Sequence, residues 1–180
     1  MWYLARTCIG AGAYLESRGL YHGDYRPVQI LLDDENNQGT VRLTDNGLIG
    51  LYRNNYILTL SGAARGYLSP ELISAYSRRE ANPAYDVYRA DVYSLGMTLL
   101  QCASLKEPEK FFYEWSVPSI AHKAIRKALD DLRSQYSPQF VDLIATMLDE
   151  NEHTRPDFFL LNVTVTKQKT KKFFNEITTM

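Results

Sequence analysis

Apolar residues recur every three to four positions in several stretches of the chain, which is the spacing of one face of an α-helix. The first stretch covers residues 2–18 and is followed by Gly19, a residue suited to a left-handed helix cap. Gly10 and Gly12 each weaken such a helix by about 1 kcal/mol relative to alanine. We therefore expect an amphipathic helix that depends on packing against the rest of the protein.

A different pattern follows this helix. Residues 30–32 and 41–44 flank a segment at 33–39 that is rich in Asp and Asn and ends in Gly39. This arrangement predicts a short β-hairpin. Residues 48–70 show no sustained period and contain several Gly, Asn and Ser, so we expect a long, mobile surface loop there.

The second half of the chain is predicted to be helical. Residues 92–103 are apolar nearly all round, as expected for a helix buried at the centre of a domain. Further helices are expected at 119–134 and 138–149, the second with Ser137 as its N-cap and Pro138 in its first turn. The fold class that follows is mainly α, with one short hairpin.

The last residues differ in composition from the rest. Residues 163–180 hold four lysines against Glu176 alone, so we place the end of the folded domain at residue 162. We interpret residues 163–180 as a basic, solvated tail, with partner binding or phospholipid binding as the other interpretation.

Composition narrows the class of protein. Of the 180 residues, 45% are hydrophobic, enough for one domain with a sizeable core. A net charge of -1 gives no general attraction to nucleic acid, and no apolar run approaches the roughly 18 residues of a membrane span. Cys8 and Cys102 lie among apolar residues and are expected to be reduced thiols. These features predict an intracellular, cytoplasmic protein that neither binds nucleic acid nor spans a membrane.

Polar motifs stand on both sides of the predicted hairpin. Residues 21–32 read YHGDYRPVQILL, and residues 44–47 read TDNG. Three further motifs follow in the second half of the chain: GYLSPE at 66–71, DVYSLG at 91–96, and Arg155-Pro156. In this order the five motifs resemble those of the protein kinase superfamily. They are similar to its catalytic loop, metal-binding turn, end of the activation loop, start of the central helix, and the arginine that pairs with a glutamate.

The resemblance implies a fold. It covers the C-terminal, mainly helical lobe of the kinase-like fold, whereas the N-lobe, with its Gly-rich loop, strand lysine and helix glutamate, is absent from these 180 residues. We therefore expect the surface that would face that lobe to be apolar and exposed, and to be open to a protein partner.

The resemblance also implies catalytic roles. Asp24, two residues after His22, is the candidate for orienting the incoming hydroxyl and taking its proton. The alternative is an aspartate that caps a turn. Arg26 replaces the lysine that touches the transferring phosphate, and it changes the geometry of the charge from a point to a fork.

Cofactor roles follow in the same way, for ATP and Mg²⁺. Asp45 is the candidate Mg²⁺ ligand, although an aspartate before Asn-Gly is also an ordinary turn signal. Gln29 occupies the place of the asparagine that ligates the second metal ion, but its oxygen lies one methylene further out. Leu31 would form the apolar floor under the adenine ring, and as a strand residue it is expected in the core.

Other matches and departures concern support and regulation. Asp91 is expected to accept backbone N–H bonds from the segment around His22, and Glu71 and Arg155 to form a buried pair. Three departures fall at positions that regulate the family or support its catalytic aspartate: Gly23 for an arginine, Asn46 for a phenylalanine, and Ala64 for a threonine.

Two functions are compatible with these residues. The first is ATP-dependent phosphoryl transfer to protein Ser or Thr, since Pro27 after Arg26 resembles the Ser/Thr group; we expect the chain alone to be inactive. The alternative is a pseudokinase-like scaffold that binds another protein. In both cases the partner or substrate is a protein.

Overall fold

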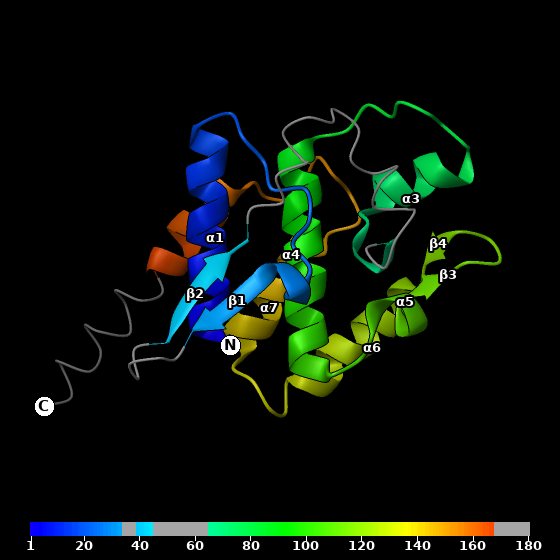
Figure 1. The fold of residues 1–180 in the computed structure, drawn as a ribbon. Coiled ribbons are helices and arrows are strands. Elements are labelled where there is room, and N and C mark those ends of the chain that lie inside the picture. Colours follow the sequence, from blue (N-terminus) through cyan, green and yellow to red (C-terminus); the bar gives the residue numbers. More distant parts are fainter. Residues whose placement is uncertain (34–38, 45–64, 168–180) are drawn as a thin grey trace, which may run out of the picture.

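The computed structural model describes residues 1–33, 39–44 and 65–167, and this part of the chain is mainly α-helical, as predicted (Figure 1). The α-helices are α1 (Trp2–Ser17), α3 (Pro70–Ser77), α4 (Val87–Ser104), α5 (Pro108–Phe111), α6 (His122–Leu132) and α7 (Pro138–Met147). The strands are β1 (Ile30–Asp33), β2 (Thr40–Leu43), β3 (Tyr113–Glu114) and β4 (Ser119–Ile120). Short 3₁₀ turns occupy Pro27–Gln29 and Arg65–Tyr67.

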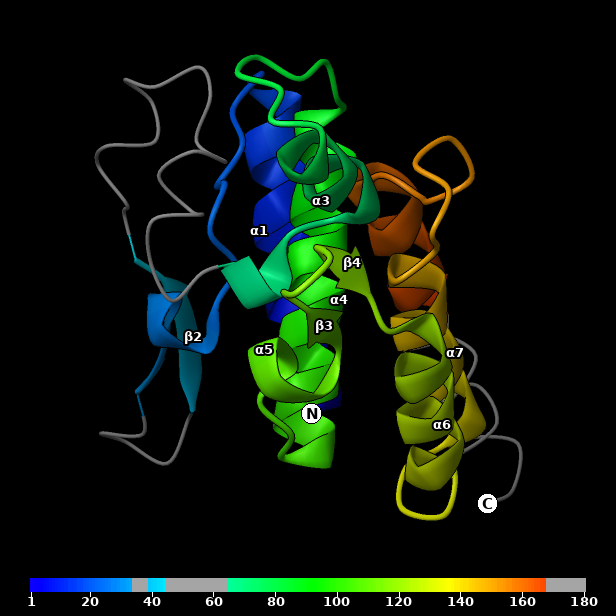
Figure 2. The ribbon, with the colours of Figure 1, turned by 90° about the vertical axis from the view of Figure 1, so that its right-hand side faces the viewer.

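Helix α4 is the centre of the fold, and the hairpin β1–β2 lies on the opposite side of it from α6 and α7 (Figure 2). Its residues are buried from Ala90 to Leu100 without a break. The helix begins at Val87 because the Asp86 side chain accepts hydrogen bonds from the backbone N–H groups of Tyr88 and Arg89. The predicted buried central helix is thus confirmed, with an N-cap that the apolar pattern did not indicate.

Helix α1 matches its predicted range, and Gly19 has the expected positive φ of 68°. The surroundings of its two internal glycines differ. A Cβ atom on Gly12 would lie 2.5 Å from the ring of Phe158, whereas a Cβ on Gly10 would meet nothing within 4 Å. Gly12 is therefore needed for the close approach of Phe158, which is 2% exposed.

This contrast gives a matched pair of stability predictions. Gly12→Ala should lower the free energy of unfolding by about 1 kcal/mol, because overlap with a packed ring outweighs the gain in helix propensity. Gly10→Ala should raise it by about 1 kcal/mol, because the helix gains propensity without overlap. Urea denaturation of both variants measures the two changes. Equal shifts in the same direction would show that Phe158 does not need the space at Gly12.

The predicted hairpin is present, with Ile30 opposite Leu43 and Leu31 opposite Arg42 in an antiparallel pair. The expectation that Leu31 belongs to the core is wrong: its side chain is 52% exposed, and that of Leu32 is 72% exposed. The sheet has two strands, and among the described residues no element covers this part of β1. An apolar run identifies a strand but does not show that something packs on it.

The helices after α5 differ in detail from their predicted ranges. The helix expected at 119–134 begins at His122, because Ser119–Ile120 pairs with Tyr113–Glu114 as a small sheet. Helix α7 starts at Pro138 as predicted, but Ser137 does not cap it through its side chain. The Ser137 hydroxyl instead accepts a hydrogen bond of 3.3 Å from the indole of Trp2.

The chain continues as a helix at residues 158–167, past the predicted domain end at residue 162. Leu161 and Val165, one turn apart, are both 2% exposed, so the packed core reaches at least Val165. The rest of the predicted tail lies outside the described residues, as does most of the predicted loop at 48–70. None of the described helices has the length and apolar content that crossing a bilayer requires.

The two cysteines are free, as predicted. Cys8 is buried on α1, and burial raises the pKa of its thiol to about 12. Cys102, on α4, also has a raised pKa because of burial. Both side chains are therefore thiols at neutral pH, without reactive thiolate character.

Candidate active site

The loop at residues 20–26 is fastened to α4 by one carboxylate. Asp91 accepts backbone N–H bonds from His22 at 2.7 Å and from Gly23 at 2.8 Å, which confirms the predicted contact. Asp91 is 4% exposed. Burial raises its pKa to about 7, although the two N–H donors act in the opposite direction.

Gly23 contributes a second feature of this attachment. Its φ is 75°, in the left-handed region, where a residue with a side chain is strained. The substitution of the family's arginine by Gly23 therefore coincides with a backbone conformation that suits glycine. An arginine here would require a different path of the loop around Asp91, or the strain of a positive φ.

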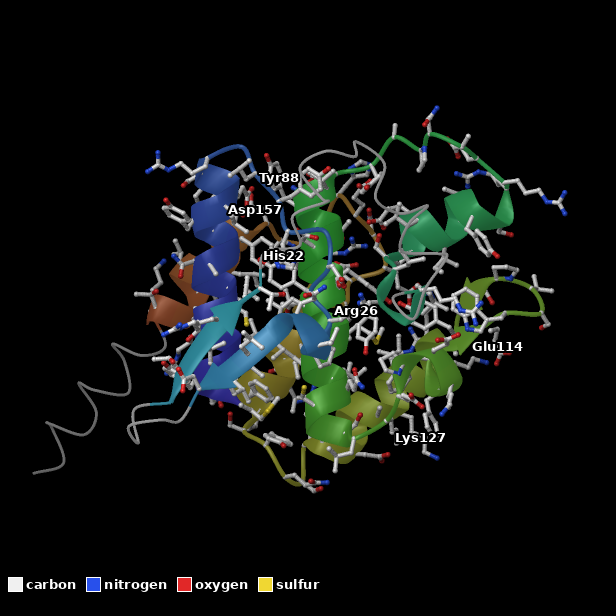
Figure 3. The ribbon with its side chains drawn as sticks, viewed as in Figure 1. His22, Arg26, Tyr88, Glu114, Lys127 and Asp157 are labelled. Atoms are coloured by element: carbon white, nitrogen blue, oxygen red, sulfur yellow. The ribbon has the colours of Figure 1, made fainter. Side chains whose placement is uncertain are left out.

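Three of the predicted site residues form one polar cluster beside α4, where Figure 3 shows His22 and Arg26. Arg26 donates two hydrogen bonds to Asp24, from Nε to Oδ1 at 2.6 Å and from Nη2 to Oδ2 at 2.7 Å. Gln29 donates from Nε2 to Oδ2 of Asp24 at 2.8 Å. The hydrogen bond to Asp24 raises the pKa of Arg26, so its guanidinium stays charged.

Thr44, which the sequence analysis did not single out, ties this cluster to the end of β2. Its backbone N–H donates to the carbonyl of Gln29 at 2.9 Å, and its hydroxyl contacts Oε1 of Gln29. Its carbonyl oxygen lies 2.9 Å from Nε2 of His22. A single sequence carries no signal for this role beyond the position of Thr44 directly before Asp45.

The remaining predicted residues are not part of the cluster or cannot be placed. Leu31 follows on β1 with an exposed side chain. Asp45, Asn46 and Ala64 lie outside the described residues. Asp24, Arg26 and Gln29 are therefore brought together, whereas the predicted meeting of Asp24 with Asp45 stays a prediction.

The surroundings of Gln29 bear on its predicted role as a ligand of a second Mg²⁺ ion. Within the described residues, no group of three or more His, Cys, Asp or Glu side chains gathers in a geometry that could hold a metal. The amide oxygen of Gln29, the only group there predicted to ligate it, faces the hydroxyl of Thr44. Mg²⁺ requires near-ideal octahedral oxygen geometry, so this oxygen would have to leave the Thr44 hydroxyl before it could ligate the ion.

A second set of contacts fixes the segment that leads into α3. Arg65 donates from Nε to Glu109 of α5 at 2.6 Å, and its guanidinium lies 4.7 Å from the centre of the Trp115 ring. A Cβ atom on Gly66 would lie 2.8 Å from the backbone nitrogen of Glu109, so glycine allows the close approach. The hydroxyl of Tyr67 contacts Gln101 of α4. None of these contacts was predicted, because none follows a periodic pattern.

The predicted pair of Glu71 and Arg155 is present, with Arg155 fully buried and the Glu71 side chain 16% exposed. The guanidinium of Arg155 donates to both carboxylate oxygens, at 2.9 Å and 3.0 Å. It also donates to the backbone carbonyls of Asp149 at 3.0 Å and Arg89 at 3.1 Å. This one side chain therefore joins the start of α3, the start of α4 and the segment after α7.

Comparison with known proteins agrees with this geometry. The family model of the protein kinase domain matches residues 3–174. The chain is 30% identical over 159 residues to the dual specificity mitogen-activated protein kinase kinase hemipterous of Drosophila melanogaster, a match that covers 83% of the chain and 12% of that protein.

Two further relatives are protein kinases as well. The serine/threonine-protein kinase 10-A of Xenopus laevis is 30% identical over 156 residues, with 85% of the chain and 16% of the relative covered. The CBL-interacting serine/threonine-protein kinase 2 of Arabidopsis thaliana is 28% identical over 178 residues, with 97% and 34% covered. The chain thus spans about a third or less of the length of these relatives. The motif order, the Asp91 anchor, the buried Glu71–Arg155 pair and the family match together establish that the chain belongs to the protein kinase superfamily.

Proposed function

We propose that this chain is the substrate-orienting part of a protein kinase that transfers a phosphoryl group from ATP to a Ser or Thr hydroxyl of a protein. The observation that carries the proposal is the position of Asp24, 7% exposed on a loop that Asp91 fastens to the central helix. A carboxylate held near an incoming hydroxyl orients it and accepts its proton. Relatives of the chain are named as Ser/Thr and dual specificity kinases, which supports this class of acceptor.

Arg26 has two tasks in this proposal. In the present geometry its guanidinium binds both oxygens of Asp24, so a substrate hydroxyl takes the place of one of these N–H groups. The released N–H group then faces the phosphoryl group that is transferred. A guanidinium presents a planar fork of donors, which suits phosphate oxygens.

The phosphoryl donor is ATP, and Leu31 offers its exposed apolar side chain as one wall for the base. Metal binding by the kinase depends on Asp45 in this proposal. The residues that hold the α- and β-phosphates in the family are not found in these 180 residues, so we expect transfer only when another lobe supplies them. The free thiols of Cys8 and Cys102 suit a reducing compartment such as the cytoplasm.

A pseudokinase-like scaffold is the second candidate, and a specific observation favours it. The side chains of Val28, Leu31 and Leu32 are 68%, 52% and 72% exposed and follow one another closely along the chain. Exposed apolar groups offer contact area to another protein, although Leu31 and Leu32, as neighbours in a strand, point to opposite faces of the hairpin. The closed Asp24–Arg26 pair and the engaged amide of Gln29 are also compatible with a domain that binds and does not catalyse.

Phosphate transfer separates the two candidates. The protein is assayed with radiolabelled ATP, Mg²⁺ and a generic protein substrate, first as the 180-residue chain and then together with a kinase N-lobe in one polypeptide. In the second form, Asp24→Asn should lower transfer by about 100-fold or more, the usual contribution of a positioned general base. The first form should show no transfer above its own Asp24→Asn variant.

The control for this assay is Asp130→Asn, which changes an exposed aspartate of α6 and should leave transfer unchanged. Circular dichroism checks that all variants are equally folded. Equal transfer by wild type and Asp24→Asn in the second form would contradict the enzymatic proposal and favour the scaffold.

A further inference from the structure

The side chain of Gln29 is engaged at both ends. Its Nε2 donates to Oδ2 of Asp24 at 2.8 Å, and its Oε1 faces the hydroxyl of Thr44. The direction of these contacts is fixed by chemistry. An ionised carboxylate only accepts hydrogen bonds, so the NH₂ end of the amide must face Asp24, and the carbonyl end then faces the hydroxyl, which donates.

The backbone of Thr44 is held next to Gln29 on two sides. Its N–H donates to the backbone carbonyl of Gln29 at 2.9 Å, and its own carbonyl lies 2.9 Å from Nε2 of His22. His22 in turn is fastened through its backbone N–H to Asp91 at 2.7 Å. The hydroxyl that holds the Gln29 oxygen is therefore attached to the same anchor as Asp24.

From these contacts we infer that Gln29 is a positioning residue, a polar strut between Thr44 and Asp24, and that it does not ligate a second metal ion. The inference deepens the proposed function, on which it rests, because the strut fixes the carboxylate that orients the substrate hydroxyl. It changes the metal requirement expected at this site from two ions to at most one.

Ligation of Mg²⁺ by Gln29 would require two groups to lose their partners. The amide would have to rotate so that its oxygen leaves the Thr44 hydroxyl, and its NH₂ group would then leave Oδ2 of Asp24. Both contacts are part-buried, and partly buried polar groups that lose a partner are costly. The amide oxygen of Gln29 and the one carboxylate beside it, that of Asp24, are few ligands for the ion, and among the described residues no group of three or more His, Cys, Asp or Glu side chains could hold a metal.

The test is the side-chain amide NMR signal of Gln29 in the full ¹⁵N-labelled chain, assigned by its absence in Gln29→Glu. Mg²⁺ alone, and then Mg²⁺ with ATP, is added to millimolar concentration. The strut predicts no saturable shift of this signal. It also predicts that Thr44→Val moves the signal and speeds the exchange of its protons with water by about fivefold to tenfold, the contribution of one ordinary hydrogen bond.

Thr44→Ser, which keeps the hydroxyl, should restore the wild-type signal. A saturable Mg²⁺-dependent shift in the wild type would overturn the inference, and so would an unchanged signal in Thr44→Val. If Thr44→Val fails to fold, the Mg²⁺ titration of the wild type and the Thr44→Ser spectrum still test the inference. This experiment does not measure phosphate transfer, so its result is independent of the proposed function. A chain that transfers no phosphate could still show the Gln29 strut. Absence of the strut would not decide the role of Asp24, which the transfer assay tests.

Discussion

Arg155→Met should lower the free energy of unfolding by about 3 to 5 kcal/mol, the usual cost of removing one partner from a buried ion pair. Arg155 is fully buried, and its guanidinium holds both carboxylate oxygens of Glu71. Methionine fills a similar space but leaves the carboxylate without its counter-charge. It also strips a donor from the backbone carbonyls of Asp149 and Arg89. Chemical denaturation followed by circular dichroism measures the loss.

The matched control is Arg133→Met. Arg133 donates to Asp142 at 2.8 Å, a similar distance, but its side chain is 44% exposed and that of Asp142 is 60% exposed. An exposed pair contributes about 1 kcal/mol or less, so the control should be close to wild type. Similar losses of stability in both variants would contradict the account in which buried Arg155 holds three segments together.

The double variant Glu71→Leu, Arg155→Met tests the same pair by removing both of its charges. When both charges are removed, no unpaired buried charge is left, and part of the lost stability should return. The double variant should therefore be more stable than Arg155→Met alone. Additive losses would mean that the two side chains act independently of each other.

Asp91→Ala should lower the free energy of unfolding by about 2 to 5 kcal/mol, because two N–H donors lose their acceptor at once. These donors are the backbone N–H groups of His22 and Gly23, at 2.7 Å and 2.8 Å from the carboxylate. His22 is 8% exposed, so water does not readily replace the lost partner. The loop that carries Asp24 should loosen in the same variant, which thermal denaturation and proteolysis both detect.

Asp86→Ala is the control on the same helix. Asp86 caps the N-terminus of α4, accepts from the N–H groups of Tyr88 and Arg89, and has a side chain that is 41% exposed. Loss of such a cap costs about 1 kcal/mol and does not touch the catalytic loop. A loss in Asp91→Ala no larger than in Asp86→Ala would show that Asp91 is an ordinary residue of the helix.

The sequence predicts those parts of the site in which a residue of one family motif pairs with a residue of another. Asp91 with the loop at His22, and Glu71 with Arg155, belong to this class. The apolar periodicity likewise predicts α1, because a stripe that repeats over four turns has few other interpretations, and the run that is apolar nearly all round predicts the buried α4.

Contacts that depend on how distant segments pack were not predictable. The hydroxyl of Thr44 meets Gln29 only because the hairpin has one particular register, and Phe158 reaches Gly12 from the far end of the chain. The exposure of Leu31 depends on whether another element covers β1, which the apolar run itself does not reveal. In each case the missing information is tertiary packing rather than local preference.

The central claim is that α4, through Asp91, fixes the loop on which Asp24 is presented to a substrate. Amide hydrogen exchange at His22 and Gly23 tests it most directly, because their N–H groups are the donors. We predict that both amides in the wild type exchange almost as slowly as the buried amides of α4, and that Asp91→Ala, but not Asp86→Ala, loses this protection. Exchange of these two amides at the rate of an unfolded chain in the wild-type protein would contradict the claim.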